Sequence, residues 1–212
     1  TYSHALHMGP LSPDEATWAK PREDLSNAID FAQSIGARSI YMVTGGRPSR
    51  MRWEEAAEIF AAILAPVLPE AKAAGMPILI ETAPFVYSMV HLAHSLRDTV
   101  QLAEMAGIGV CIDLFSSWWE ADLKATIERA VPICHLVQVG DYKAGDTSIP
   151  CRAVPGDGNI PIAQLCEWIL GAGYQGGFDF ELIGPRIDQE GHFAAVRRAG
   201  EYMTGVLDKL GA

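Results

Sequence analysis

Residues 77–82 read PILIET and residues 109–114 read GVCIDL, and each run carries a carboxylate at the end of a short apolar segment. Such apolar, β-branched runs are typical of parallel β-strands that are buried on both faces. The runs HLVQVGD at 135–141 and GFDFEL at 177–182 have the same form and carry Gln138 and Glu181 near their ends. The four runs therefore predict parallel strands that each present a polar side chain at the carboxyl end.

The rest of the chain alternates between strand-like runs and amphipathic helical segments, several of which end on glycine. Strict alternation predicts parallel strands joined by right-handed crossovers. An open doubly wound sheet would need a glycine-rich phosphate loop after its first strand, and none occurs, so a (β/α)8 TIM barrel is favoured. We expect strands at 2–8, 38–44, 77–82, 109–114, 133–141 and 177–182, and helices at 14–35, 54–74, 92–106, 120–130, 162–172 and 193–210.

The composition is 49% hydrophobic and 20% charged, which is ordinary for a globular protein, and predicts one domain over residues 1–212. The formal net charge of −10 argues against nucleic acid as a partner, because an acidic surface repels phosphate. No apolar run approaches the roughly 20 residues that span a bilayer, and no signal-peptide pattern opens the chain. We expect a cytoplasmic protein without a membrane partner, and leave a homo-oligomer open.

Glu81, Asp113, Gln138 and Glu181 lie at matching depth on successive predicted strands, which would gather them at the carboxyl end of the sheet. Three carboxylates and one amide form a hard, oxygen-rich ligand set. It suits Mn²⁺ or Mg²⁺ best, with Zn²⁺ or Co²⁺ as alternatives. A single strand-end carboxylate often only caps the next helix, but four at one depth favour a metal site.

The stretches GARSIYMVTGG, PILIETAP, HSLRDTVQLAEMAGIGVCIDLFSSW, HLVQVGDYKAG, RAVPGDGNI and GYQGGFDFEL together resemble the xylose isomerase-like TIM barrels. The resemblance implies metal ligands of the types Glu, Asp, His and Glu, which fall on Glu81, Asp113, Gln138 and Glu181. Gln138 replaces the usual His, as in hydroxypyruvate isomerase-like members. Counting back from Glu181 on the eighth strand, the first two strand–helix units of the barrel are expected to be missing.

The resemblance implies a divalent-metal isomerase or epimerase of a sugar, sugar phosphate or related hydroxy-carbonyl compound. Glu81 and Glu181 would move the α-proton through an enediolate. A lyase or dehydratase that eliminates a β-substituent from a keto-sugar or 3-keto-glycoside is the alternative, and a degenerate non-catalytic barrel is a third. A nuclease of the endonuclease IV type would need a histidine-rich zinc site and a basic face, which the sequence lacks.

Five further residues are expected to contact the substrate. Lys143, Arg152 and Arg186 would hold a phosphate, carboxylate or oxyanion of the substrate. Trp118 would form an apolar wall of the site. Ketose 3-epimerase-like members carry a second Glu and a His where Tyr87 and Ser116 stand here. We therefore expect that free ketoses are not epimerised at C3, and that the substrate carries a larger, flatter or an anionic group. The expected substrate-binding residues are His7, Trp118, Lys143, Arg152 and Arg186.

Overall fold

The computed structural model describes all 212 residues, which divide into two compact units, Thr1–Cys111 and Ile112–Ala212. Six parallel strands follow the order β1-β2-β3-β4-β5-β8. The predicted parallel sheet of a partial TIM barrel is confirmed, with two strands fewer than the eight of a closed barrel. The expectation of a single domain over 1–212 stays a prediction. None of the helices combines the length and the apolar character that crossing a membrane requires.

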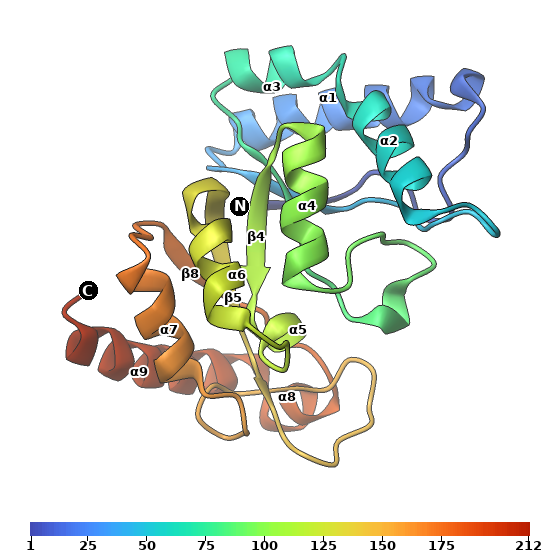
Figure 1. Ribbon diagram of the computed structural model, residues 1–212. Helices are drawn as coiled ribbons and strands as arrows, with labels where there is room; N and C mark the ends of the chain where they lie inside the picture. The colour runs from blue at the N-terminus through green and yellow to red at the C-terminus, as the bar shows by residue number, and fades with distance from the viewer. The chain divides into compact units, whose positions relative to one another are not determined.

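The first unit alternates strands and helices, and its helices α1 to α4 are labelled in Figure 1. Parallel pairing joins β1 to β2, β2 to β3 and β3 to β4, and places Glu81 opposite Cys111. Fully buried Ile40, Met42 and Leu79 form the strand side of its core. The elements are β1 (Tyr2–Ala5), η1 (Glu15–Thr17), α1 (Ala19–Ser34), β2 (Ile40–Val43), α2 (Trp53–Leu64), α3 (Leu68–Ala73), β3 (Ile78–Glu81), η2 (Phe85–Tyr87), α4 (Leu96–Ala106) and β4 (Gly109–Asp113).

The predicted helices of this unit differ from the structure in their bounds. The helix expected over 14–35 begins at Ala19, and the one expected over 92–106 begins at Leu96. The expected helix over 54–74 is two helices, since α2 ends at Leu64 and α3 begins at Leu68. Pro66 lies between them, and proline has no N–H to continue the hydrogen-bonded ladder of a helix. The predicted helix stop at Gly107 is confirmed, because Gly107 takes a left-handed conformation with a φ of 70°.

The second unit continues the alternation, and α9 runs beside α7 in it (Figure 1). Strand β5 pairs with β8, with Gln138 opposite Asp179, and a small apolar cluster of Val154, Leu182 and Ile187 packs against α9. The elements are α5 (Leu114–Ser117), α6 (Leu123–Ala130), η3 (Val131–Ile133), β5 (Cys134–Val139), β6 (Asp141–Tyr142), β7 (Arg152–Ala153), α7 (Ile162–Gly171), β8 (Gly177–Phe180), α8 (Pro185–Glu190) and α9 (His192–Leu210).

The two-stranded antiparallel ladder of β6 and β7 was not predicted, and the expected strand over 133–141 ends at Val139. Gly140 lies at the interruption, where space is tight. A Cβ at this position would lie 2.9 Å from the carbonyl oxygen of Glu181 and 3.1 Å from Cδ of Arg152, so only glycine fits without a shift of its neighbours. The chain turns there, and β6 then brings Tyr142 opposite Arg152.

Candidate metal and carboxylate site

Asp113 is the last residue of β4 and is fully buried. Its carboxylate caps α5, because Oδ1 accepts the backbone N–H of Phe115 at 3.1 Å. The hydroxyl of Ser116 donates to Oδ2. The capping role that strand-end carboxylates often have is therefore real here, but it uses only part of the acceptor capacity of Asp113.

The remaining capacity is taken by Arg152, whose side chain is 5% exposed. Its Nη1 donates to Asp113 Oδ1 at 2.9 Å and its Nη2 to Oδ2 at 2.8 Å, which is a bidentate ion pair. Nη2 also forms an ion pair with Oε2 of Glu181. The guanidinium lies over the ring of Phe115, with its carbon 4.4 Å from the ring centroid. One buried cation thus serves two carboxylates.

Glu181 follows β8 and extends its ladder by one bond, from its N–H to the carbonyl of Val139 at 3.1 Å. Its Oε2 contacts Arg152 as an ion pair and lacks hydrogen-bond geometry to any donor. Burial, reinforced by the charges of Asp113 and Asp179, raises the pKa of Glu181 to about 7, although Arg152 opposes the shift. The raised pKa means that the positive charge of Arg152 does not fully offset the cost of burying the ionised carboxylate.

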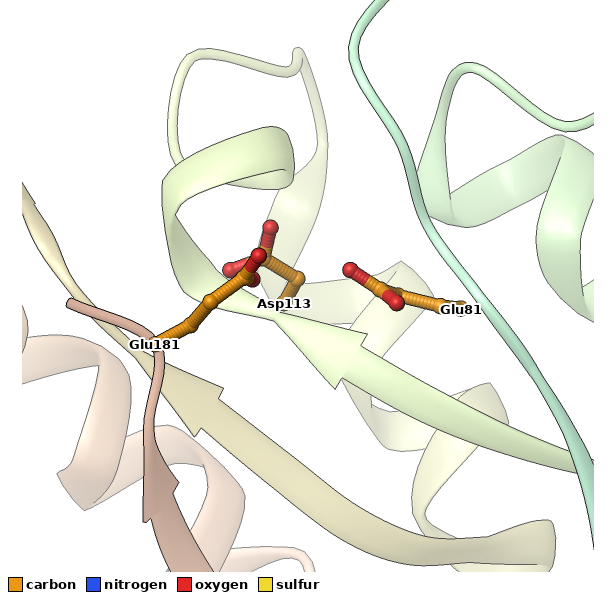
Figure 2. Close-up of side chains that lie close together, drawn as sticks. All are labelled: Glu81, Asp113 and Glu181. Carbon is orange, nitrogen blue, oxygen red and sulfur yellow. The ribbon is translucent and has the colours of Figure 1, made fainter. Parts of the chain in front are cut away.

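Glu81 is the last residue of β3, and β4 continues two residues past its partner Cys111 to reach Asp113. Figure 2 draws the side chains of Glu81, Asp113 and Glu181, three carboxylates that could hold a metal ion. The grouping of these three carboxylates in one site, and their role as metal ligands, stay predictions.

The backbone of Glu81 is held by His91, a buried residue that sequence reasoning did not identify as part of the site. The N–H of Thr44 donates to Nδ1 of His91 at 3.1 Å, so the ring proton lies on Nε2 and is donated to the carbonyl of Glu81 at 2.7 Å. Burial lowers the pKa of His91 to about 4, which keeps the ring neutral at physiological pH. A neutral histidine here fixes a main-chain atom rather than binding a ligand.

Gln138 is buried in β5, opposite Asp179, and its chain neighbour Val139 accepts the N–H of Glu181. The structure therefore places Gln138 on the strand next to the one that leads to Glu181, as predicted. Its role as a fourth ligand stays a prediction.

Asp141 is a second buried carboxylate near the site, and the sequence did not single it out. Its Oδ2 accepts the N–H groups of Gly156 and Gly158, both at 2.9 Å. Its Oδ1 accepts those of Tyr142 at 2.8 Å and Ile160 at 3.0 Å. The glycines of the run VPGDGN gave the only signal for this arrangement, since closely spaced glycines indicate backbone that can approach an acceptor. Asp141 fixes the segment that follows Arg152.

Among the predicted substrate-binding residues, Arg152 differs most from expectation. It was expected at the rim of the site, whereas it is buried and ion-paired with Asp113 and Glu181, because the β6–β7 ladder carries it inward. Arg186 is exposed and bound to Asp146 at 2.6 Å, and exposed Lys143 lines the same surface cavity of about 240 Å³. The other two are exposed His7, beside Leu11 and Trp18, and half-buried Trp118, 6.4 Å from Tyr142 between ring centroids.

The residues present fit a divalent ion of the hard class. The donor set is rich in carboxylate oxygen, and the guanidinium of Arg152 already stands as a cation against Asp113 and Glu181. The raised pKa of Glu181 points the same way, because a doubly charged ion would supply the positive charge that this carboxylate lacks.

Comparison with known proteins identifies the family of the chain. Its sequence matches the family described as xylose isomerase-like TIM barrel over residues 1–202. The fold is similar to that of protein SMc04130 from Sinorhizobium meliloti 1021, with a TM-score of 0.74, 26% sequence identity, and coverage of 92% of this chain and 76% of that one. No curated protein sequence matches the chain.

Two further structures, one of a zinc-bound protein and one of a sugar epimerase, are similar in fold. IolI protein, described with a bound zinc atom, has a TM-score of 0.81 and 15% identity over 99% of this chain and 77% of that one. D-psicose 3-epimerase from Clostridium cellulolyticum H10, solved with D-tagatose, has a TM-score of 0.75 and 15% identity over 99% and 76%. At such identity these two likenesses concern the fold, whereas the family match spans nearly the whole sequence, and the chain therefore belongs to the xylose isomerase-like TIM barrel family.

Proposed function

We propose that this protein is a divalent-metal-dependent isomerase or epimerase of a sugar, a sugar phosphate or a related hydroxy-carbonyl compound. The observation that carries the proposal is the pair of strand-end carboxylates, Asp113 and Glu181, that share one buried cation. The fold of the family, and structural neighbours described as a ketose 3-epimerase and as a zinc-binding protein, support it. The expected partner is a small carbohydrate-like molecule.

In this proposal Glu81, Asp113, Gln138 and Glu181 hold the ion. When bound, the ion would polarise the carbonyl and hydroxyl oxygens of the substrate and so acidify the hydrogen on the hydroxyl-bearing α-carbon. Mn²⁺ or Mg²⁺ suits the oxygen donors best, and the zinc of the IolI structure keeps Zn²⁺ among the candidates.

Two carboxylates of the chain would transfer the proton. Glu81 takes the α-proton, which leaves an enediolate, and Glu181 returns a proton to the neighbouring or the same carbon. The raised pKa of Glu181 belongs to the metal-free site, and a bound ion would lower it by adding positive charge beside the carboxylate.

Ser116 and Tyr87 make a C3 epimerase of free ketoses a poor candidate. The hydroxyl of Ser116 is committed to Asp113, and Tyr87 lies in the short helix η2 with 36% of its surface exposed. Neither supplies a group that is ionised at neutral pH. We propose a substrate with a larger, flatter or an anionic group instead.

β-Elimination from a keto-sugar or 3-keto-glycoside is the second candidate. Phe115, Trp118 and Tyr142 form an aromatic group, with centroid distances of 6.1 Å and 6.4 Å from Tyr142 to the other two rings. Such apolar surface could accept an aglycone, which a free sugar does not have. Both candidates begin with removal of the same α-proton.

The test is exchange of that proton. Metal-loaded protein is incubated in D₂O with ketoses, ketose phosphates, hydroxy-keto acids and 3-keto-glycosides, and NMR follows deuterium at the α-carbon. We expect exchange with at least one class, loss of exchange in Glu81→Gln and Glu181→Gln, and near-normal exchange in Tyr87→Phe. Isomers or unsaturated ketones among the products separate the two candidates. Exchange that survives in Glu181→Gln, or robust epimerisation of fructose or tagatose by the wild type, would contradict the assignment.

A further inference from the structure

We propose that Arg152 is an internal competitor of the divalent ion: it neutralises the carboxylates of the metal-free site, and metal binding requires its guanidinium to leave them. The inference rests on the proposed function, because it assumes that Asp113 and Glu181 are metal ligands. It adds a residue that sets how tightly the ion is held.

The first step concerns the acceptor capacity of Asp113. An ionised carboxylate offers about four lone-pair positions. Phe115 N–H and Arg152 Nη1 use Oδ1, and Ser116 Oγ and Arg152 Nη2 use Oδ2. Every position is filled, so a metal ion can bind Asp113 only if one of these donors withdraws.

The second step concerns which donor withdraws. The N–H of Phe115 is main chain in the first turn of α5, and the Ser116 hydroxyl is neutral and belongs to the same helix. Nη2 of Arg152 is a cation in contact with both Asp113 Oδ2 and Glu181 Oε2. It therefore occupies the position from which an ion would reach both carboxylates, and two positive charges repel each other there.

The third step concerns how the guanidinium is retained. Away from these carboxylates, the guanidinium lies over the face of Phe115 and close to Gly140, where an added Cβ would lie 3.3 Å from Nη1. Neither is a directed ionic bond. Asp113 and Glu181 hold Arg152 by ionic contacts, and a doubly charged ion can compete with it for both carboxylates.

The opposite role for Arg152 is also physically reasonable, and it predicts the opposite result. Side chains that hydrogen-bond to metal ligands often orient them, and removing such a group weakens metal binding. Competition predicts that removing Arg152 strengthens metal binding. The sign of the change in affinity decides between the two.

The experiment measures Mn²⁺ binding to chelator-treated protein from the EPR signal of free Mn²⁺. The variants are Arg152→Gln, which removes the charge, and Arg152→Lys, which keeps a charge without the bidentate fork. The matched control is Arg197→Gln, which makes the same change of net charge at an exposed position on α9. We expect Arg152→Gln to bind Mn²⁺ about tenfold or more tightly than wild type, Arg152→Lys to lie between them, and Arg197→Gln to stay within about twofold of wild type.

Wild-type protein supplies a second readout that does not depend on the folding of a variant. In metal-free protein, the Nη hydrogens of Arg152 should give slowly exchanging NMR signals, identified by their nuclear Overhauser contacts with the ring of Phe115. Saturation with diamagnetic Mg²⁺ or Zn²⁺ should abolish or strongly shift these signals.

Unchanged or weaker Mn²⁺ affinity in Arg152→Gln, or Nη signals that persist at metal saturation, would overturn the competition while leaving the metal enzyme intact. Absence of Mn²⁺ binding by wild type and Arg152→Gln alike would overturn the proposed function, and the competition with it.

Discussion

Two buried aspartates of the second unit, Asp113 and Asp141, each accept four hydrogen bonds, but from different kinds of donor. Asp113 accepts two bonds from its own helix and two from Arg152, whereas Asp141 accepts four, all from backbone N–H groups. Backbone donors cannot leave without unfolding the segment that carries them. An arginine side chain can leave. The nature of the donors, more than the burial of the carboxylate, separates a structural aspartate from one that can exchange partners.

The largest expected effect comes from Asp141→Asn. The substitution places an amide NH₂ against at least one pair of backbone N–H groups, which then lose their acceptor in a buried position. We expect a loss of about 3 kcal/mol or more in the free energy of unfolding, measured by urea denaturation. A loss below about 1 kcal/mol would show that the 156–160 segment does not depend on this carboxylate.

Asp113→Asn should cost less stability and more metal affinity. Glu181 can still neutralise Arg152 in this variant, so we expect a loss of about 2 kcal/mol by the same denaturation method. Mn²⁺ affinity should fall roughly 100-fold or more, because a charged ligand is replaced by a neutral one. If Asp113→Asn bound Mn²⁺ as wild type does, Asp113 would be a helix cap and nothing more.

Two glycines extend the comparison to the backbone. A Cβ at Gly158 would lie 2.3 Å from Asp141 Oδ1 and 2.4 Å from the carbonyl of Tyr142, whereas a Cβ at Gly140 meets its nearest atom at 2.9 Å. We expect Gly158→Ala to cost about 2–3 kcal/mol of unfolding free energy and Gly140→Ala about 1 kcal/mol. Thermal and urea unfolding of the two variants should show this order, and the reverse order would contradict it.

The smallest expected effect is a pH dependence. Glu181 has a pKa of about 7 in the folded protein, above that of a carboxyl in the unfolded chain. Between about pH 4.5 and 7 the folded state therefore holds the proton that the unfolded state has lost, so this residue's contribution to stability declines as pH rises. We expect a decline on the order of 1 kcal/mol in metal-free wild type that is absent in Glu181→Gln. The exposed-acid control Glu58→Gln should keep the wild-type slope.

The fold was largely predictable because its signals are local. Apolar runs, helical spacing and glycine stops gave the order of the six parallel strands, and Pro66 was the main local signal left unused. Glu81, Asp113 and Glu181 were proposed as a group because each lies at or directly after the carboxyl end of a parallel strand, and the grouping itself stays a prediction.

The partners of these carboxylates were not predictable in the same way. Arg152 lies 39 residues from Asp113 in the sequence and reaches it through a two-residue ladder that leaves almost no strand signal. His91 and Thr44 are 47 residues apart and meet only through tertiary packing. Contacts of this kind depend on the positions that loops take in the folded protein, and the chemistry of single residues does not specify those positions.

The ladder of β6 and β7 contains only two residue pairs, Asp141 with Ala153 and Tyr142 with Arg152. In a β-ladder a slip of one residue turns every side chain to the opposite face, and so short a ladder has little pairing of its own to resist a slip. Here a slip would exchange the arginine for Cys151 or Ala153. The four backbone bonds to Asp141 hold the strand alignment, so this aspartate decides which side chain the hairpin presents to Asp113.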